Sequence, residues 1–189
     1  MKINLRRVTT GAVLIAAASA FLFCTGFTKA SDHGNHENGY LKSATYYSDD
    51  WVINFWNSES SHMDEELKQI REDGFNSIIL VVPWREFQPS MAPEHYNDYA
   101  WEKFDRVMKA AKAQDLKVML RVGYTWDYYS SENVLARYEK LLYDSETKKA
   151  WLHYAKRLYE KASAYDNFSG GFITWEDFWN FAENGSTLY

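Results

Sequence analysis

Apolar or β-rich segments alternate with segments of helical periodicity along residues 45–189. Residues 51–56 combine Trp, Val, Ile and Phe, a composition that favours a strand. Residues 77–82 form the run SIILVV, which is typical of a strand buried on both faces of a parallel sheet. Two further segments, 117–122 and 171–175, complete a set of four expected strands.

Between these strands, apolar side chains recur at the spacing of an amphipathic helix. The segment 62–73 has its apolar residues on one face, and Gly74 follows it as a helix stop. The segments 99–114 and 151–162 keep the same stripe, and another helix is expected to start near 177–182. Strands that alternate with helices in this way predict an α/β fold with a parallel sheet.

Periodicity alone leaves two architectures open, a doubly wound sheet and a (β/α)8 barrel. The chain has neither a GxGxxG motif after the first expected strand nor a P-loop lysine. The usual phosphate-binding signatures of doubly wound folds are therefore missing.

The N-terminal segment 1–30 has the order of a secretory signal peptide. A basic start precedes an almost uncharged stretch over residues 8–23, and small residues surround an expected cleavage site after Ala30. An uncleaved anchor is the alternative, but the apolar stretch is short for a membrane span, which needs ~20 residues. We expect cleavage, a flexible polar leader over 31–44, and a secreted or cell-surface protein without a membrane partner.

Composition narrows the function classes further. The one cysteine, Cys24, lies in the expected signal peptide, so the mature chain has no thiol for a disulfide, a metal site or a nucleophile. The formal charge of −5 falls to −9 without residues 1–30, which hold four basic and no acidic residues. An acidic chain argues against nucleic acid as a partner. We expect neither a cofactor nor a metal ion.

Aromatic residues make up 17% of the sequence and include eight tryptophans. A Trp-rich core and a sugar-binding surface both explain this, since pyranose C–H faces pack on flat aromatic rings. In parallel β/α folds, functional side chains gather past the C-terminal ends of the strands. The candidates at those places are Trp56, Trp84, Glu86, Arg121, Trp126, Asp127, Trp175 and Glu176.

Three segments carry a resemblance to a known family. They are GFNSIILVVPWREFQP at 74–89, AKAQDLKVMLRVGYTWD at 111–127 and GGFITWEDFWN at 170–180. The chain resembles the (β/α)8-barrel glycoside hydrolases of the superfamily that contains the cellulase-like family 5 enzymes. The resemblance implies the N-terminal half of such a barrel over 45–189, about four β/α units, with a carbohydrate as partner.

Site roles follow from the same resemblance. Glu176 would be the general acid/base at the end of the fourth strand, and the nucleophile at the end of the seventh strand would lie beyond this chain. Trp175 stands where the superfamily usually has Asn. The chemistry needs both carboxyl groups, because one protonates the glycosidic oxygen while the other attacks the anomeric carbon or activates water.

Each candidate also has a plain structural interpretation. Glu176 would alternatively stabilise the first turn of the next helix. Glu86 and Asp127 would either contact sugar hydroxyls or pair with arginines. The tryptophans at 56, 84 and 126 would either stack on sugars or pack at the rim, and Arg121 would either bind substrate or be a paired strand residue. Two alternatives to an exported glycosidase stay open: a non-catalytic carbohydrate-binding barrel and an inactive fragment.

Overall fold

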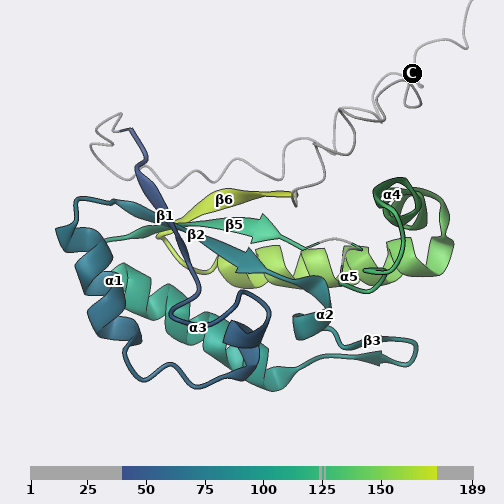
Figure 1. Cartoon of the computed structure of the whole chain (residues 1–189), viewed down its shortest axis with the longest axis horizontal. Coiled ribbons are helices and arrows are strands. Elements are labelled where there is room, and N and C mark those ends of the chain that lie inside the picture. Colours follow the sequence, from purple (N-terminus) through teal and green to yellow (C-terminus); the bar gives the residue numbers. More distant parts are fainter. Residues whose placement is uncertain (1–39, 124, 126, 174–189) are drawn as a thin grey trace, which may run out of the picture. The chain divides into compact units, whose positions relative to one another are not determined.

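The computed structural model describes residues 40–123, 125 and 127–173. Four parallel strands form one sheet in the order β1-β2-β5-β6 (Figure 1). The strands are β1 Ser43–Tyr46, β2 Ser77–Val82, β5 Lys117–Val122 and β6 Phe168–Ile173. The helices α1 Met63–Glu72, α3 Asp98–Ala113 and α5 Ser145–Ala162 connect them and lie along one face of the sheet (Figure 1).

Smaller elements fill the connections. A 3-10 helix, η1, spans Asn54–Asn57, and a one-turn helix, α2, spans Trp84–Phe87 directly after β2. A short hairpin of β3 Ser90–Met91 and β4 Glu94–His95 then leads into α3. The helix α4, Val134–Tyr143, precedes α5. The parallel α/β sheet expected from the alternating pattern is confirmed, and the strand and helix positions agree except at the two ends of the sheet.

The prediction of a first strand over residues 51–56 is wrong. The first strand of the sheet is β1, whose residues Ser43 and Ala44 pair with Ser77 and Ile78 of β2, so two residues assigned to the leader belong to the sheet. The segment 51–56 instead forms a loop and the start of η1. Its buried members are Val52, Phe55 and Trp56. This i, i+3, i+4 spacing is helical, whereas a half-buried strand would bury alternate residues.

The last strand also begins earlier than expected. β6 starts at Phe168 and is described to Ile173, whereas the sequence predicted residues 171–175. Its pairing with β5 is irregular between Val118 and Met119, where Gly170 has a φ of 121°. The expected helix start at 177–182 lies outside the described residues.

The core lies between the sheet and the helices. Leu80 and Leu120 of the central strands are fully buried against Phe104 of α3 and Leu158 of α5, as members of one hydrophobic cluster. Asparagine or aspartate residues cap α3, α4 and α5. Asn97, for example, accepts a hydrogen bond from the backbone N–H of Ala100 in the first turn of α3. No helix in the described ranges is both long enough and apolar enough to span a membrane.

Candidate active site at the strand ends

Because β2 and β5 are parallel and in register, their last residues, Val82 and Val122, lie side by side at the same edge of the sheet. Figure 1 shows α2 beside this edge. The two chain segments then approach each other closely at Gly123, whose N–H donates to the carbonyl of Val82 at 2.8 Å. A Cβ at Gly123 would lie 2.5 Å from the backbone nitrogen of Trp84, so the contact requires glycine.

Asp127 links these two segments. Its Oδ2 accepts a hydrogen bond from the backbone N–H of Arg85 at 2.6 Å, which places the carboxylate at the first turn of α2. The side chain is only 7% exposed, and its Oδ1 has no hydrogen-bond partner. Burial raises the pKa of Asp127 to about 7, and the amide of Arg85 opposes that rise. A group so enclosed offers little surface to a sugar, and its observed contact is with the segment that carries Arg85. A sugar contact of Asp127 stays a prediction.

Glu86 is half-buried, so part of its side chain is accessible to solvent. Its carboxylate accepts a hydrogen bond from Nδ2 of Asn57, and its carbonyl accepts one from Nδ2 of Asn97 at 3.0 Å. Asn97 also donates to Oδ1 of Asn57 at 3.0 Å. This amide and carboxylate cluster joins η1, α2 and the start of α3. Contact between Glu86 and a sugar hydroxyl stays a prediction.

Trp56 and Trp84 expose no ring face on which a sugar could stack, since both are fully buried. Nε1 of Trp56 donates to the carbonyl of Val81 at 2.9 Å, and its ring stacks against Phe104 with 6.4 Å between centroids. The Trp84 ring stacks against Tyr154 in the same way, at 6.3 Å. Both indoles fill the space between the sheet and its helices, so the expected stacking role is wrong for these two residues.

Arg121 lies in β5 between Val81 of β2 and Phe172 of β6 in the strand register. Its neighbours Leu120 and Val122 belong to the core under the helices, so alternation along the strand directs Arg121 to the other face of the sheet. Its side chain is half-buried, and it interacts with other groups. Trp126, Trp175 and Glu176 lie outside the described residues, and their roles stay predictions.

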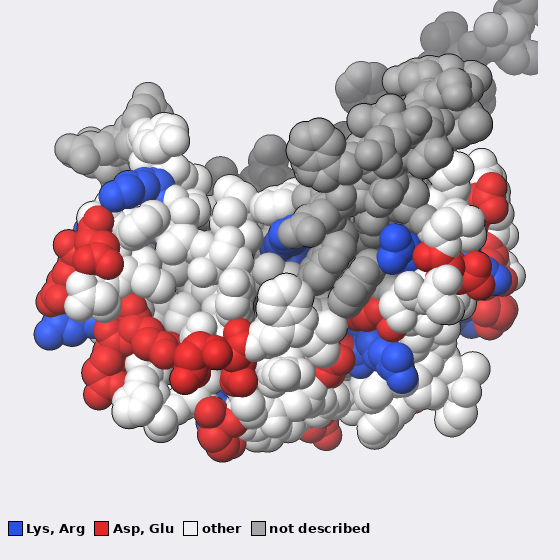
Figure 2. Space-filling model, in the orientation of Figure 1, with Lys and Arg blue, Asp and Glu red and all other residues white. Residues whose placement is uncertain are grey.

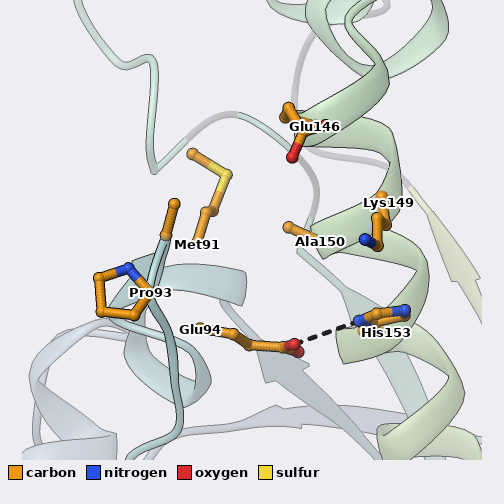
Figure 3. Close-up of a pocket in the computed structure, with 8 residues that line it drawn as sticks. Met91, Pro93, Glu94, Glu146, Lys149, Ala150 and His153 are labelled. Atoms are coloured by element: carbon orange, nitrogen blue, oxygen red, sulfur yellow. Dashed lines mark hydrogen bonds and ion pairs between the residues drawn. The ribbon is translucent and has the colours of Figure 1, made fainter.

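A pocket that the sequence did not predict lies between the β3–β4 hairpin and α5 (Figure 3). Its volume is about 300 Å³. The Glu94 carboxylate lies 3.2 Å from Nδ1 of His153 and also accepts hydrogen bonds from Gln88 and Tyr96. The hydrogen bond from Tyr96 lowers the pKa of Glu94. Since Glu94 and His153 are 59 residues apart, no local pattern signals this contact, which fastens the hairpin to the helix.

Figure 2 shows one face of the molecule, where acidic side chains form a continuous band and basic side chains are scattered. Such a face gives a polyanion few cations to bind. Among the described residues, no three His, Cys, Asp or Glu side chains are grouped so as to hold a metal ion. The absence of a nucleic-acid partner and of a cofactor remain predictions.

No family model and no curated protein sequence matches this chain. Solved structures with the same architecture do match. A GH5_18 alanine variant from Bifidobacterium longum subsp. longum ATCC 55813, in complex with Manβ1-4GlcNAc, superposes with a TM-score of 0.57 and 18% identity. The match covers 71% of this chain and 33% of that one. GH5_18 from Streptomyces cattleya, in complex with GlcNAc, gives 0.56 and 18%, and covers 70% and 33%.

A third match is the exo-β-1,4-mannosidase Op5Man5 from Opitutaceae bacterium strain TAV5, with a TM-score of 0.52, 16% identity, and coverage of 63% of this chain and 21% of that one. The chain thus spans about a third of the length of the first structures it matches. Its fold is that of a segment of a (β/α)8 barrel. More particularly, it is the fold that the GH5_18 structures and the exo-β-1,4-mannosidase share over the matched region, which agrees with the barrel fold that the sequence resemblance implied.

Proposed function

We propose that this chain is part of an exported glycoside hydrolase that cleaves O-glycosyl bonds in an oligo- or polysaccharide. The observation that carries the proposal is the barrel fold that the chain shares with GH5_18 structures, together with parallel pairing that brings the C-terminal ends of β2, β5 and β6 to one edge of the sheet. Signal-peptide features in residues 1–30 support export.

Glu176 is our candidate for the general acid/base, because it follows β6 by three residues. Strand ends are where this fold class gathers its chemistry. A carboxylic acid there would protonate the glycosidic oxygen as the bond breaks, and a second carboxylate would attack the anomeric carbon or activate water. Asp127 is too enclosed for that second role, and the nucleophile is proposed to come from outside the described residues.

β-Linked mannose-containing glycans are the first substrates to test. Two of the similar structures hold Manβ1-4GlcNAc or GlcNAc, and a third is named as an exo-β-1,4-mannosidase. These ligands belong to those proteins, and the present chain shares only the fold with them. We therefore propose the class of substrate, a β-linked oligosaccharide, and leave the individual sugar to the assay.

The test is to compare Glu176→Gln with the wild type on two substrates, Manβ1-4GlcNAc and a nitrophenyl β-mannoside. Formate is added as an external nucleophile in place of the second carboxylate. The amide cannot deliver a proton, so turnover of the disaccharide should fall by ~10²–10⁴-fold. The nitrophenyl substrate should lose less, because its leaving group departs without protonation. Glu102→Gln, at an exposed position on α3, is the matched control. Wild-type rates for Glu176→Gln on both substrates would refute the assignment.

A second function, non-catalytic carbohydrate binding, is favoured by one observation. Trp175 occupies the place where the related enzymes usually have an asparagine next to the acid/base. Binding of oligosaccharides without turnover of either substrate, with and without formate, would support this alternative over the hydrolase.

A further inference from the structure

Trp51 differs from the other tryptophans in the described part of the chain. Its side chain is 61% exposed, whereas Trp56, Trp84 and Trp101 are at most 3% exposed. Trp151 is half-buried, with its Nε1 donating to the carbonyl of Gly123 at 2.9 Å. An exposed indole leaves a large apolar ring in water, which marks it as a candidate contact surface.

Hydrogen bonds to buried residues hold the backbone that carries Trp51. The carbonyl of Trp51 accepts a hydrogen bond from the N–H of Phe55 at 2.9 Å, and Phe55 is fully buried. Nζ of the buried Lys103 donates to the carbonyls of Phe55 and Ser58 and lies 3.9 Å from the centre of the Phe55 ring. Ser58 in turn donates to the carboxylate of Asp50. A fixed backbone lowers the entropy lost when a ligand packs on the ring.

The position of Trp51 in the fold is at the same edge as the candidate active site. The loop 47–53 follows the C-terminal end of β1, and all four strands are parallel. Since β1 and β6 are three strand spacings apart, their ends are separated by about 14 Å along the sheet, at ~4.8 Å per spacing. A single sugar held where β6 ends does not reach the end of β1, whereas a chain of sugars does.

The surroundings of the ring combine an aromatic edge with polar groups. Tyr47 meets Trp51 edge-on, with 6.5 Å between ring centroids and an interplanar angle of 64°. Asp49, Asn54 and Asn57 are exposed in the same segment of chain. Exposed carboxylate and amide groups in the chain segment that carries a flat ring suit a sugar, whose hydroxyl groups need hydrogen-bond partners while its C–H face packs on the ring.

We propose that Trp51 is a stacking platform for an outlying sugar unit of an oligosaccharide, so that the site prefers glycan chains to single sugars. This inference rests on the proposed function, because it takes a carbohydrate as the ligand. It adds a residue after β1 to a site that was otherwise built from the ends of β2, β5 and β6. A second protein docking on the ring would need a broad apolar surface, and the exposed neighbours of Trp51 are acidic and amide side chains.

The experiment is calorimetric titration of the full chain with β-1,4-mannohexaose and with mannose, for the wild type, Trp51→Ala and Trp51→Phe. The hexaose Kd should rise on the order of ten-fold in Trp51→Ala, which corresponds to about 1.4 kcal/mol. Trp51→Phe should retain part of the affinity, and mannose binding should not change. Tyr40→Ala is the matched control, since Tyr40 is 88% exposed but precedes β1 and so lies at the opposite end of that strand.

An unchanged hexaose Kd in Trp51→Ala would overturn the platform, as would an equal loss of affinity in Tyr40→Ala. The result is separable from the catalytic proposal. If the wild type cleaves the nitrophenyl mannoside but does not bind hexaose more tightly than mannose, the platform fails and the hydrolase stands. If Glu176→Gln keeps wild-type rates while Trp51→Ala weakens hexaose binding, the platform stands and the assignment of Glu176 fails.

Discussion

Burial of the Asp127 carboxyl group disfavours its charged form, because the carboxylate loses hydration that the hydrogen bond from the amide of Arg85 offsets only in part. Its Oδ1 has no partner, and the carboxylate of Glu86 adds a like charge that raises the pKa further. Near neutral pH the residue is thus divided between its two protonation states. The same side chain that connects the segments after β2 and β5 therefore makes folding sensitive to pH.

Asp127→Asn should remove this sensitivity. The folded state holds the proton more tightly than the unfolded chain, so the contribution to stability is fully present below pH 3.8 and is lost as the pH rises through 7. A pKa raised from 3.8 to about 7 corresponds to at most about 4 kcal/mol. Asparagine keeps an acceptor for the amide of Arg85 and is neutral at every pH.

Urea unfolding at pH 4 and pH 8 measures the effect. We expect Asp127→Asn to be more stable than the wild type by about 1–3 kcal/mol at pH 8 and nearly equal to it at pH 4. Asp98→Asn, at an exposed position in the first turn of α3, is the control and should not reduce the pH dependence. Parallel pH profiles for the wild type and Asp127→Asn would show that the carboxyl group stays ionised in the folded state.

At the scale of elements, η1 and the loop before it depend on a lysine from another helix. Lys103 of α3 is fully buried, and burial lowers its pKa. Its Nζ donates hydrogen bonds to two backbone carbonyls, that of Phe55 within η1 and that of Ser58 directly after η1. A buried cation is costly unless it is hydrogen-bonded, and here the carbonyls supply that compensation. The shape of the loop that presents Trp51 is thus determined by a side chain about fifty residues away.

Lys103→Met should loosen this loop without unfolding the sheet. Methionine fills a similar volume but removes one hydrogen bond from each carbonyl, at a cost of about 1–3 kcal/mol in total. The carbonyl of Ser58 keeps the hydroxyl of Tyr99 as a donor at 2.9 Å, and among the described residues that of Phe55 keeps only the hydroxyl of Ser58 at 3.4 Å. Hydrogen–deuterium exchange should rise in residues 51–58 and stay unchanged in β2 and β5. Lys109→Met, at an exposed position on the same helix, is the control. Unchanged exchange in 51–58 would mean that Phe55 and Trp56 hold the loop without the lysine.

At the scale of the whole molecule, both outer strands of the described sheet have an unpaired edge. In the described part of the chain β1 pairs only with β2, and β6 pairs only with β5. Ile173 at the end of β6 is 47% exposed, and Ile79 and Met119 of the central strands are half-buried. Unpaired edges and apolar surface favour aggregation or docking of further barrel units. The GH5_18 structures with this fold are about three times as long as the region they share with this chain.

Turnover by the 189-residue chain tests how complete its active site is. We expect little hydrolysis of the nitrophenyl β-mannoside without formate, because Asp127 is enclosed and Glu86 is engaged with Asn57. Formate should raise the rate by acting as a nucleophile in place of the proposed second carboxylate. Robust hydrolysis without formate would contradict this, and loss of that activity in Glu86→Gln would identify Glu86 as the second carboxylate.

The sequence by itself determined the alternation of strands and helices. Residues 77–82 and 117–122 are recognisable because central strands of a parallel sheet must be apolar along their length, and this constraint is local. The resemblance in the segments around β2, β5 and β6 was enough to predict the barrel fold. The short edge strand β1 was missed, since SATY pairs on one side only and carries no long apolar run.

Only the tertiary structure decided which polar and aromatic groups are accessible. Trp51 and Trp56 stand five residues apart in one aromatic segment, yet Trp51 is exposed and Trp56 is fully buried. The ring of Trp56 packs against Phe104, and its Nε1 donates to the carbonyl of Val81. Asp127 is enclosed where its carboxylate accepts a hydrogen bond from the amide of Arg85, which is distant in the sequence. Exposure and pKa depend on contacts between residues far apart in the chain, and such contacts produce no periodic pattern in the sequence.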